Sequence, residues 1–275
     1  MDKRRVSLPQ VLLGIFVILA LILGMAIGKY RQSQQTEGND IILPIEEPGI
    51  DYEKIDRTNG RFSYEDENYT SLFGIDVSTY QNEIDWKKVK EDGVDFVFIR
   101  IGRRGATSGL LYEDDLFETN YAGARENGLK VGVYFFSQAV SEKEAREEAD
   151  WVRKHLSGKQ IDLPVVYDCE EVYLEDEAPR MEGLDKEQIT ANAKAFAERI
   201  ARHRYETIIY TNAYWAEEVY DMNELSDIPV WLAQYDVEIP VFEHPFVIWQ
   251  YTDSGQIDGI EGPVDLNIMF LPKGE

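Results

Sequence analysis

Short apolar runs bounded by glycine, proline and acidic residues recur along the second part of the chain and predict β-strands. Between the first five of them, apolar residues return every three or four positions, which predicts amphipathic helices over residues 85–92, 115–127, 141–156 and 186–204. After the fifth run there is one short helical piece, residues 215–220, and then closely spaced strands. The eight expected strands are residues 73–78, 96–102, 131–136, 163–168, 207–211, 229–235, 246–251 and 264–267.

Regular alternation of strand and helix is typical of α/β proteins with a parallel sheet. Five strand-helix units followed by three strands predict an irregular TIM-like barrel that is helical on one side and strand-rich on the other. The barrel is assigned to residues 71–275, a length that fits one domain with a full hydrophobic core.

Residues 11–28 carry no charged side chain, and at ~1.5 Å per residue such a helix is about 27 Å long, roughly the thickness of the hydrocarbon layer. Lys3, Arg4 and Arg5 precede it, so the positive-inside rule places residues 1–10 in the cytoplasm. The sequence predicts a transmembrane signal anchor in the cell membrane, an extracellular linker over residues 29–70 and the barrel domain outside the cytoplasm. A cleaved signal peptide and a secreted protein are the alternative.

The formal charge of −24 lies mostly in residues 71–275 and argues against nucleic acid as a partner, because a polyanion would be repelled. Cys169 is the only cysteine, so the chain forms no intrachain disulfide. The histidines, His155, His203 and His244, lack the spacing of metal ligands. A phosphate-binding glycine loop is also missing, and we expect neither a metal nor a cofactor.

Candidate chemistry lies where an apolar strand runs into carboxylates, in the sequence Val-Val-Tyr-Asp-Cys-Glu-Glu over residues 165–171. Side chains alternate across a strand, so Asp168 and Glu170 share one face while Glu171 has the opposite parity. Burial and like-charge proximity can raise the pKa of one acid while the other stays ionised, which suits general acid catalysis on an acetal oxygen. An ordinary acidic junction between strand and loop is the simpler interpretation of the same residues.

Further acids and aromatic residues occupy the expected strands. Asp76 belongs to the first strand and Asp265 to the last, and a barrel brings these two strands together. Aromatic faces can pack against sugar rings, although strand aromatics are more often core residues. Acids together with aromatics predict a carbohydrate cleft. The candidate substrate-binding residues are Tyr134, Tyr210, Trp231, Tyr235, Trp249 and Tyr251.

With these motifs the chain resembles glycoside hydrolase family 25, the muramidases often called Chalaropsis-type lysozymes. The resemblance covers residues 73–271 and is carried by residues 74–81 with 84–86, residues 166–170, 231–235, 249–251 and 264–267. The family fold is an irregular barrel of five strand-helix units and three strands. The resemblance further implies the substrate, the glycan strands of peptidoglycan, cut at the β-1,4 bond between N-acetylmuramic acid and N-acetylglucosamine.

The resemblance implies that Glu170 is the general acid and later the base that activates water. It makes Asp168 the partner that stabilises the transition state, orients the substrate's N-acetyl group or attacks directly. Asp76 and Asp265 match the two other active-site acids of the family, with roles in substrate positioning and electrostatic tuning. The bacterial wall is largely anionic, so this acidic domain gains no long-range attraction to it. A membrane tether would instead supply a high local concentration at the wall, which favours a role in local cell-wall remodelling.

Two other functions fit the same residues. One is a catalytically idle, membrane-tethered glycan-binding module that keeps the barrel and its aromatics. The other is a chitinase-like glycosidase, whose fourth strand also ends in Asp-x-Glu but usually carries earlier acids, which residues 163–167 lack. The sequence does not indicate the oligomeric state.

Overall fold

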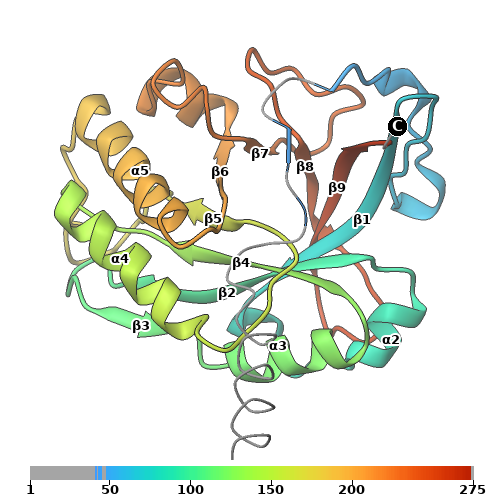
Figure 1. Ribbon diagram of the computed structural model, residues 1–275, viewed down its shortest axis with the longest axis horizontal. Coiled ribbons are helices and arrows are strands. Elements are labelled where there is room, and N and C mark those ends of the chain that lie inside the picture. The colour runs from blue at the N-terminus through green and yellow to red at the C-terminus, as the bar shows by residue number, and fades with distance from the viewer. Residues whose placement is uncertain (1–40, 42, 45–47, 274–275) are drawn as a thin grey trace, which may run out of the picture. The chain divides into compact units, whose positions relative to one another are not determined.

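The computed structural model describes residues 41, 43–44 and 48–273 of the chain, and its central feature is a β-barrel (Figure 1). The strands pair in chain order around the ring, and the ring is closed because the first strand pairs with both the second and the last. The eight predicted strands are confirmed, as β1 (Tyr69–Val77), β2 (Phe96–Arg104), β4 (Lys130–Phe136), β5 (Val165–Asp168), β6 (Thr207–Asn212), β7 (Val230–Ala233), β8 (Ile248–Gly255) and β9 (Val264–Pro272).

The strands of the ring are parallel from β1 to β8, as predicted, but β9 is antiparallel to both of its neighbours. The segment 256–263 between β8 and β9 is too short for the crossover of a dozen or more residues that a parallel pair needs. A further strand, β3 (Leu111–Glu113), extends the sheet antiparallel to the end of β2. Three residues are too few to show a period, so the sequence did not predict it.

The predicted helices cover the outer face of one part of the barrel (Figure 1). They start at side-chain caps where the sequence offers them: Asp85, Ser141 and Asp185 each accept a backbone N–H of the first turn. A π-helical turn, η4 (Trp215–Val219), follows β6 and corresponds to the short helical piece expected there. The α-helices of the described residues are α2 (Trp86–Glu91), α3 (Phe117–Glu126), α4 (Glu142–His155) and α5 (Lys186–Ala201).

Large aromatic side chains fill the interior of the barrel. Phe96 and Phe98 point inward from β2, and Phe98 stacks on Trp231 of β7 with ring centroids 4.8 Å apart. Gly74 and Gly132 make room for them, because a Cβ atom at either position would lie 2.3 Å from one of these phenylalanine rings. The alternate residues of β2, Val97 and Ile99, point outward and belong to the second core, between the sheet and its outer cover. The barrel interior is therefore packed where the parallel strands begin, and the end where these strands finish is left to carry a site.

Residues 48–68, predicted as part of the linker, cover the strand-rich side that the helices leave open. Phe62 stacks on Tyr251 of β8 with ring centroids 3.8 Å apart, and the buried Tyr64 packs edge-on against Phe270 of β9. Ile55 is buried in the same outer core. This short segment therefore shields the outer face of β8 and β9 from water, as the helices do for the other strands.

Three short 3₁₀ turns complete the described chain: η1 (Tyr52–Lys54), η2 (Thr58–Gly60) and η3 (Thr79–Gln81). In this part of the chain, no helix has both the length and the apolar character needed to cross a membrane. The predicted transmembrane segment, residues 11–28, lies outside the described residues.

Candidate active site

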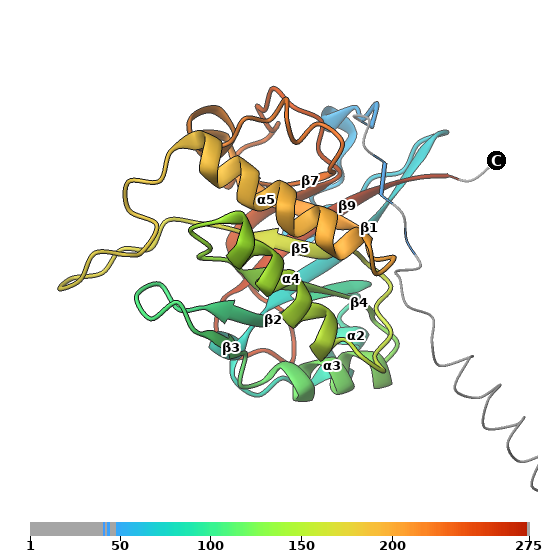
Figure 2. The ribbon, with the colours of Figure 1, turned by 60° about the vertical axis from the view of Figure 1, so that its left-hand side comes forward.

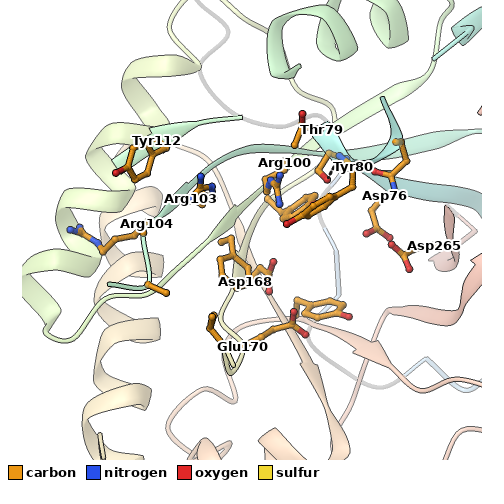
Figure 3. A pocket seen from close by; sticks show the side chains of 18 of the residues that line it. Asp76, Thr79, Tyr80, Arg100, Arg103, Arg104, Tyr112, Asp168, Glu170 and Asp265 are labelled. Atoms are coloured by element: carbon orange, nitrogen blue, oxygen red, sulfur yellow. Dashed lines mark hydrogen bonds between the residues drawn. The ribbon is translucent and has the colours of Figure 1, made fainter. Parts of the chain in front are cut away.

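Four carboxylic acids from three strands meet at one end of the barrel (Figure 3). Asp168 is the last residue of β5 and Glu170 follows two positions later, while Asp76 lies near the carboxyl end of β1. Asp265 comes near the start of β9, but β9 runs antiparallel, so this start lies at the same end and Asp265 pairs with Asp76 across the ladder. The structure thus brings together all four predicted acids.

Asp76 and Asp265 form a hydrogen-bonded pair of carboxyl groups. Asp76 is 8% exposed, and its Oδ2 accepts hydrogen bonds from Gln250 Nε2 and Asn267 Nδ2, both at 2.8 Å. Burial raises the pKa of Asp76 to about 6, against the effect of these two donors. Burial and the charge of Asp76 raise the pKa of Asp265 to about 8. Because only Asp76 has amide donors to stabilise its charge, the proton of the pair belongs on Asp265 near neutral pH.

Asp168 and Glu170 form the second pair. Burial raises the pKa of Asp168 well above its usual range, the charges of Glu170 and Asp76 act in the same direction, and the Arg100 guanidinium opposes them. Burial, followed by the charge of Asp76, also raises the pKa of Glu170. Two neighbouring acids with raised pKa values repel each other when both are ionised, which favours a state in which the pair carries one proton. The Arg100 guanidinium favours the ionised form of the deeper Asp168, against the larger effect of burial.

The acids open into a cleft of about 1000 Å³. A space of this size takes several sugar units of a chain, and aromatic side chains line it, as a sugar-binding surface requires. Trp231 forms part of its floor, where its indole Nε1 donates to Asn267 Oδ1 at 2.9 Å. Four of the six predicted aromatic residues line the cleft, namely Tyr134, Tyr210, Trp231 and Tyr235.

The two remaining aromatics, Trp249 and Tyr251, do not line the cleft. They lie on the outer face of β8, where Tyr251 stacks on Phe62 and Trp249 Nε1 donates to the Gln234 carbonyl at 2.8 Å. The prediction placed these residues on the wrong face, because alternate side chains of β8 point in opposite directions and it is Gln250 that points into the barrel.

Gln250 and Asn267 are two of the site residues that the sequence analysis missed; Arg100 is another. Gln250 accepts hydrogen bonds from Tyr210 at 2.7 Å and Tyr235 at 2.6 Å, and at its other end it donates to Asp76. Asn267 connects the same carboxylate to Trp231. The parity of the strands contained this signal, since Asn267 lies two residues after Asp265 and so shares its face.

A second wall of the cleft comes from β2 and the turn after β1. Arg100 Nη2 lies 2.7 Å from Asp114 Oδ2, and its guanidinium lies over the ring of the exposed Tyr80 with 5.0 Å to the centroid. The same Asp114 oxygen accepts the backbone N–H of Thr79 at 3.1 Å. Arg100 is therefore held in place beside Asp168 before any substrate arrives.

The described part of the chain contains no group of three or more histidine, cysteine, aspartate or glutamate residues that could hold a metal ion. Asp76 accepts hydrogen bonds from two amide side chains, and the charge of the Arg100 guanidinium acts on Asp168. This arrangement suits proton transfer to and from a neutral substrate within an aromatic cleft.

Comparisons with known proteins agree with this chemistry. The family model for glycosyl hydrolases family 25 matches residues 75–260. The chain is 31% identical over 195 residues to an autolytic lysozyme of Clostridium acetobutylicum, covering 70% of this chain and 54% of that protein. It is 32% identical over 203 residues to lysozyme M1 of Streptomyces globisporus, covering 70% of this chain and 66% of that protein. The chain thus spans about half the length of the clostridial relative.

Among solved structures, the modular autolysin LytC from Streptococcus pneumoniae, determined in complex with a synthetic peptidoglycan ligand, has the same fold. The TM-score is 0.67 at 22% sequence identity, over 78% of this chain and 51% of that chain.

Proposed function

The chain belongs to family 25 of the glycosyl hydrolases, and from this premise we propose that it is a lysozyme that hydrolyses the β-1,4 bond between N-acetylmuramic acid and N-acetylglucosamine in peptidoglycan. The observation that carries the proposal is the pair of Asp168 and Glu170 at the mouth of an aromatic cleft that Arg100 also lines, where burial raises the pKa of both acids. Relatives named lysozymes support the substrate.

The proposed reaction begins with proton transfer from the Glu170 carboxyl to the glycosidic oxygen. The bond between that oxygen and the anomeric carbon breaks, and its electron pair leaves with the glucosamine alcohol. Ionised Asp168 stabilises the positive charge that develops on the muramic acid ring. Glu170, now a carboxylate, then takes a proton from water as that water attacks the anomeric carbon, which restores the acid for the next turnover.

Asp76 and Asp265 complete the site from the opposite side of the cleft in this proposal. Asp76 is fixed by Gln250 and Asn267, and its charge contributes to the raised pKa of Glu170. An acid kept protonated near neutral pH is what general acid catalysis needs. The Gln250 network also orients Tyr210 and Tyr235, whose rings line the same cleft.

The products of wall digestion test this proposal. The protein should release fragments with muramic acid at the new reducing end, and borohydride reduction followed by sugar analysis should yield the muramic acid alcohol. Glucosamine ends would show that the other glycosidic bond is cut. Release of soluble sugars from chitin would favour the chitinase-like alternative, and no release from either polymer would favour the idle binding module.

We also propose that residues 11–28 anchor the protein in the cell membrane, with residues 29–275 outside the cytoplasm, for local remodelling of the wall. The apolar length and the preceding cluster of positive charge support this topology. The full chain should stay in the membrane pellet after an alkaline carbonate wash, whereas a shortened protein that starts at residue 38 should stay in the supernatant. Release of the full chain would point to a cleaved signal peptide.

A further inference from the structure

A second cavity, of about 470 Å³, adjoins the cleft on the far side of Glu170. Glu170, Val172 and Leu174 line both spaces, so the two lie next to each other. The walls of the second cavity come from the loop between β5 and α5, the first turn of α5 and the η4 turn. In Figure 2 this loop, in yellow, extends away from the barrel. A branch of a ligand held at Glu170 would therefore lie close to this cavity.

The charged side chains that line the second cavity are all negative. The lining contains Glu170, Glu171, Glu177 and Glu182 but no lysine or arginine. Glu171 accepts a hydrogen bond from Tyr173, and Glu177 and Glu182 are exposed and form no ion pair among the described residues. The main cleft differs, since three arginines line it together with its acids. The second cavity thus has free negative charge for a cation.

A buried acceptor without a partner also lines this cavity. Gln138 is fully buried, and its Nε2 donates to the Glu170 carbonyl at 2.9 Å, yet its Oε1 has no hydrogen-bond partner among the residues that the structure describes. An unsatisfied buried carbonyl oxygen favours an N–H donor from a ligand. Met181, Leu184 and Trp215 supply apolar walls beside it. An acceptor, acids and apolar walls together fit an ammonium group on an aliphatic stem.

The cavity is held in shape before any ligand binds. Arg180 closes the loop by donating two hydrogen bonds to Glu144 of α4, at 2.7 and 2.8 Å. The same guanidinium donates to the Gln138 carbonyl at 2.8 Å, and the Arg180 backbone N–H donates to Ala106 at 2.7 Å. A preformed cavity loses little conformational entropy on binding.

We propose that this second cavity binds the free amino group of the diamino acid in the peptide stem of peptidoglycan, an inference that rests on the proposed function. The stem is attached to muramic acid, one of the two sugars at the bond that Glu170 protonates. A stem of three extended residues reaches roughly 10 Å, enough to pass Glu170 and enter the adjoining space. The cavity thereby favours wall that still carries its peptides.

The kinetic test compares three substrates: soluble wall fragments with free amines, the same fragments after N-acetylation, and glycan strands stripped of peptide by an amidase. For the wild type, acetylation should raise KM about three- to tenfold with little change in kcat. The double variant Glu177→Gln/Glu182→Gln should show the raised KM on the amine substrate and no further rise on acetylation. On stripped glycan it should match the wild type.

The matched control is Glu175→Gln/Asp176→Asn, which removes two charges from the same loop at residues that do not line the cavity. It should behave as the wild type on all three substrates. A wild-type KM that does not change on acetylation would overturn the proposal. An equal rise in the KM of the Glu177→Gln/Glu182→Gln variant on all three substrates would also overturn it. That result would indicate that the cavity binds further sugars of the glycan.

Binding without turnover separates this inference from the proposed function. Calorimetric titration of a free stem tripeptide into the full chain in detergent should give an affinity that falls about three- to tenfold in the Glu177→Gln/Glu182→Gln variant and on acetylation of the peptide. Binding that is the same for free and acetylated peptide would contradict amine recognition. A protein that binds the peptide but hydrolyses none of the three substrates would contradict the lysozyme proposal alone.

Discussion

Replacement of Glu170 by glutamine should lower kcat by about 10²- to 10⁴-fold, the usual worth of a positioned general acid. Glutamine keeps the size of the side chain but has no proton to give to the glycosidic oxygen. The fold should survive, because the Glu170 backbone carbonyl, not its side chain, accepts the hydrogen bond from Gln138. KM should change little, since the shape of the cleft is unchanged. Steady-state kinetics on soluble wall fragments, with circular dichroism as the check on folding, measure both.

Glu171→Gln is the matched control for this prediction. Glu171 is exposed, it does not line the main cleft, and its only described side-chain contact is the hydrogen bond from the Tyr173 hydroxyl. Its kcat should stay close to that of the wild type. A folded Glu170→Gln protein with near wild-type kcat would remove Glu170 from the mechanism, and an equal loss in Glu171→Gln would show that the loop presents a different acid.

The barrel could be predicted because its strands are buried apolar runs separated by helices of clear period. The direction of β9 could have been inferred as well, since the short segment before it excludes a crossover. The cover formed by residues 48–68 could not. The residues around Phe62 and Tyr64 form no apolar pattern long enough to predict a helix or a strand. The burial of these two side chains depends on contacts with Tyr251 and Phe270, some 190 to 210 positions away along the chain.

The acids of the site could be predicted from strand parity, but the aromatics only in part. A strand with cores on both sides carries large side chains on both faces, so alternation alone does not say which face is the barrel interior. Trp231 points inward from β7, and Trp249 points outward from β8. A polar residue between aromatics was the better guide: Gln250, between Trp249 and Tyr251, marks the face that leads to Asp76.

Arg100 shows why a charge inside an apolar strand is informative. It shares the inward parity of Phe96 and Phe98 and lies midway along β2, where the aromatic core of the barrel gives way to the cleft. A buried guanidinium is costly unless it is paired, and Asp114 pairs with it. Asp114 holds Arg100 in place, and the positive charge of the guanidinium also acts on Asp168, where it opposes the rise of the pKa caused by burial.

The second large effect is expected for Asp168→Asn, which should lower kcat by about 10²- to 10³-fold, the usual cost of removing an electrostatic group aimed at the transition state. The loss should come without loss of stability. Asp168 is 7% exposed, and burial disfavours its charge, so a neutral asparagine should leave the melting temperature unchanged or higher. The Oδ1 atom of Asp168 has no hydrogen-bond partner in the described structure, so the exchange breaks none there.

The pH profile of Asp168→Asn distinguishes an electrostatic role from a merely structural one. Asp168 and Glu170 repel each other when both are ionised, and this repulsion contributes to the raised pKa of Asp168. Removing the negative charge at position 168 removes the same repulsion from Glu170, so the pKa of Glu170 should fall. Catalysis needs protonated Glu170, and the basic limb of kcat/KM should therefore move to lower pH in the variant. A basic limb at the wild-type position, together with full activity, would show that Asp168 neither repels Glu170 nor stabilises the transition state.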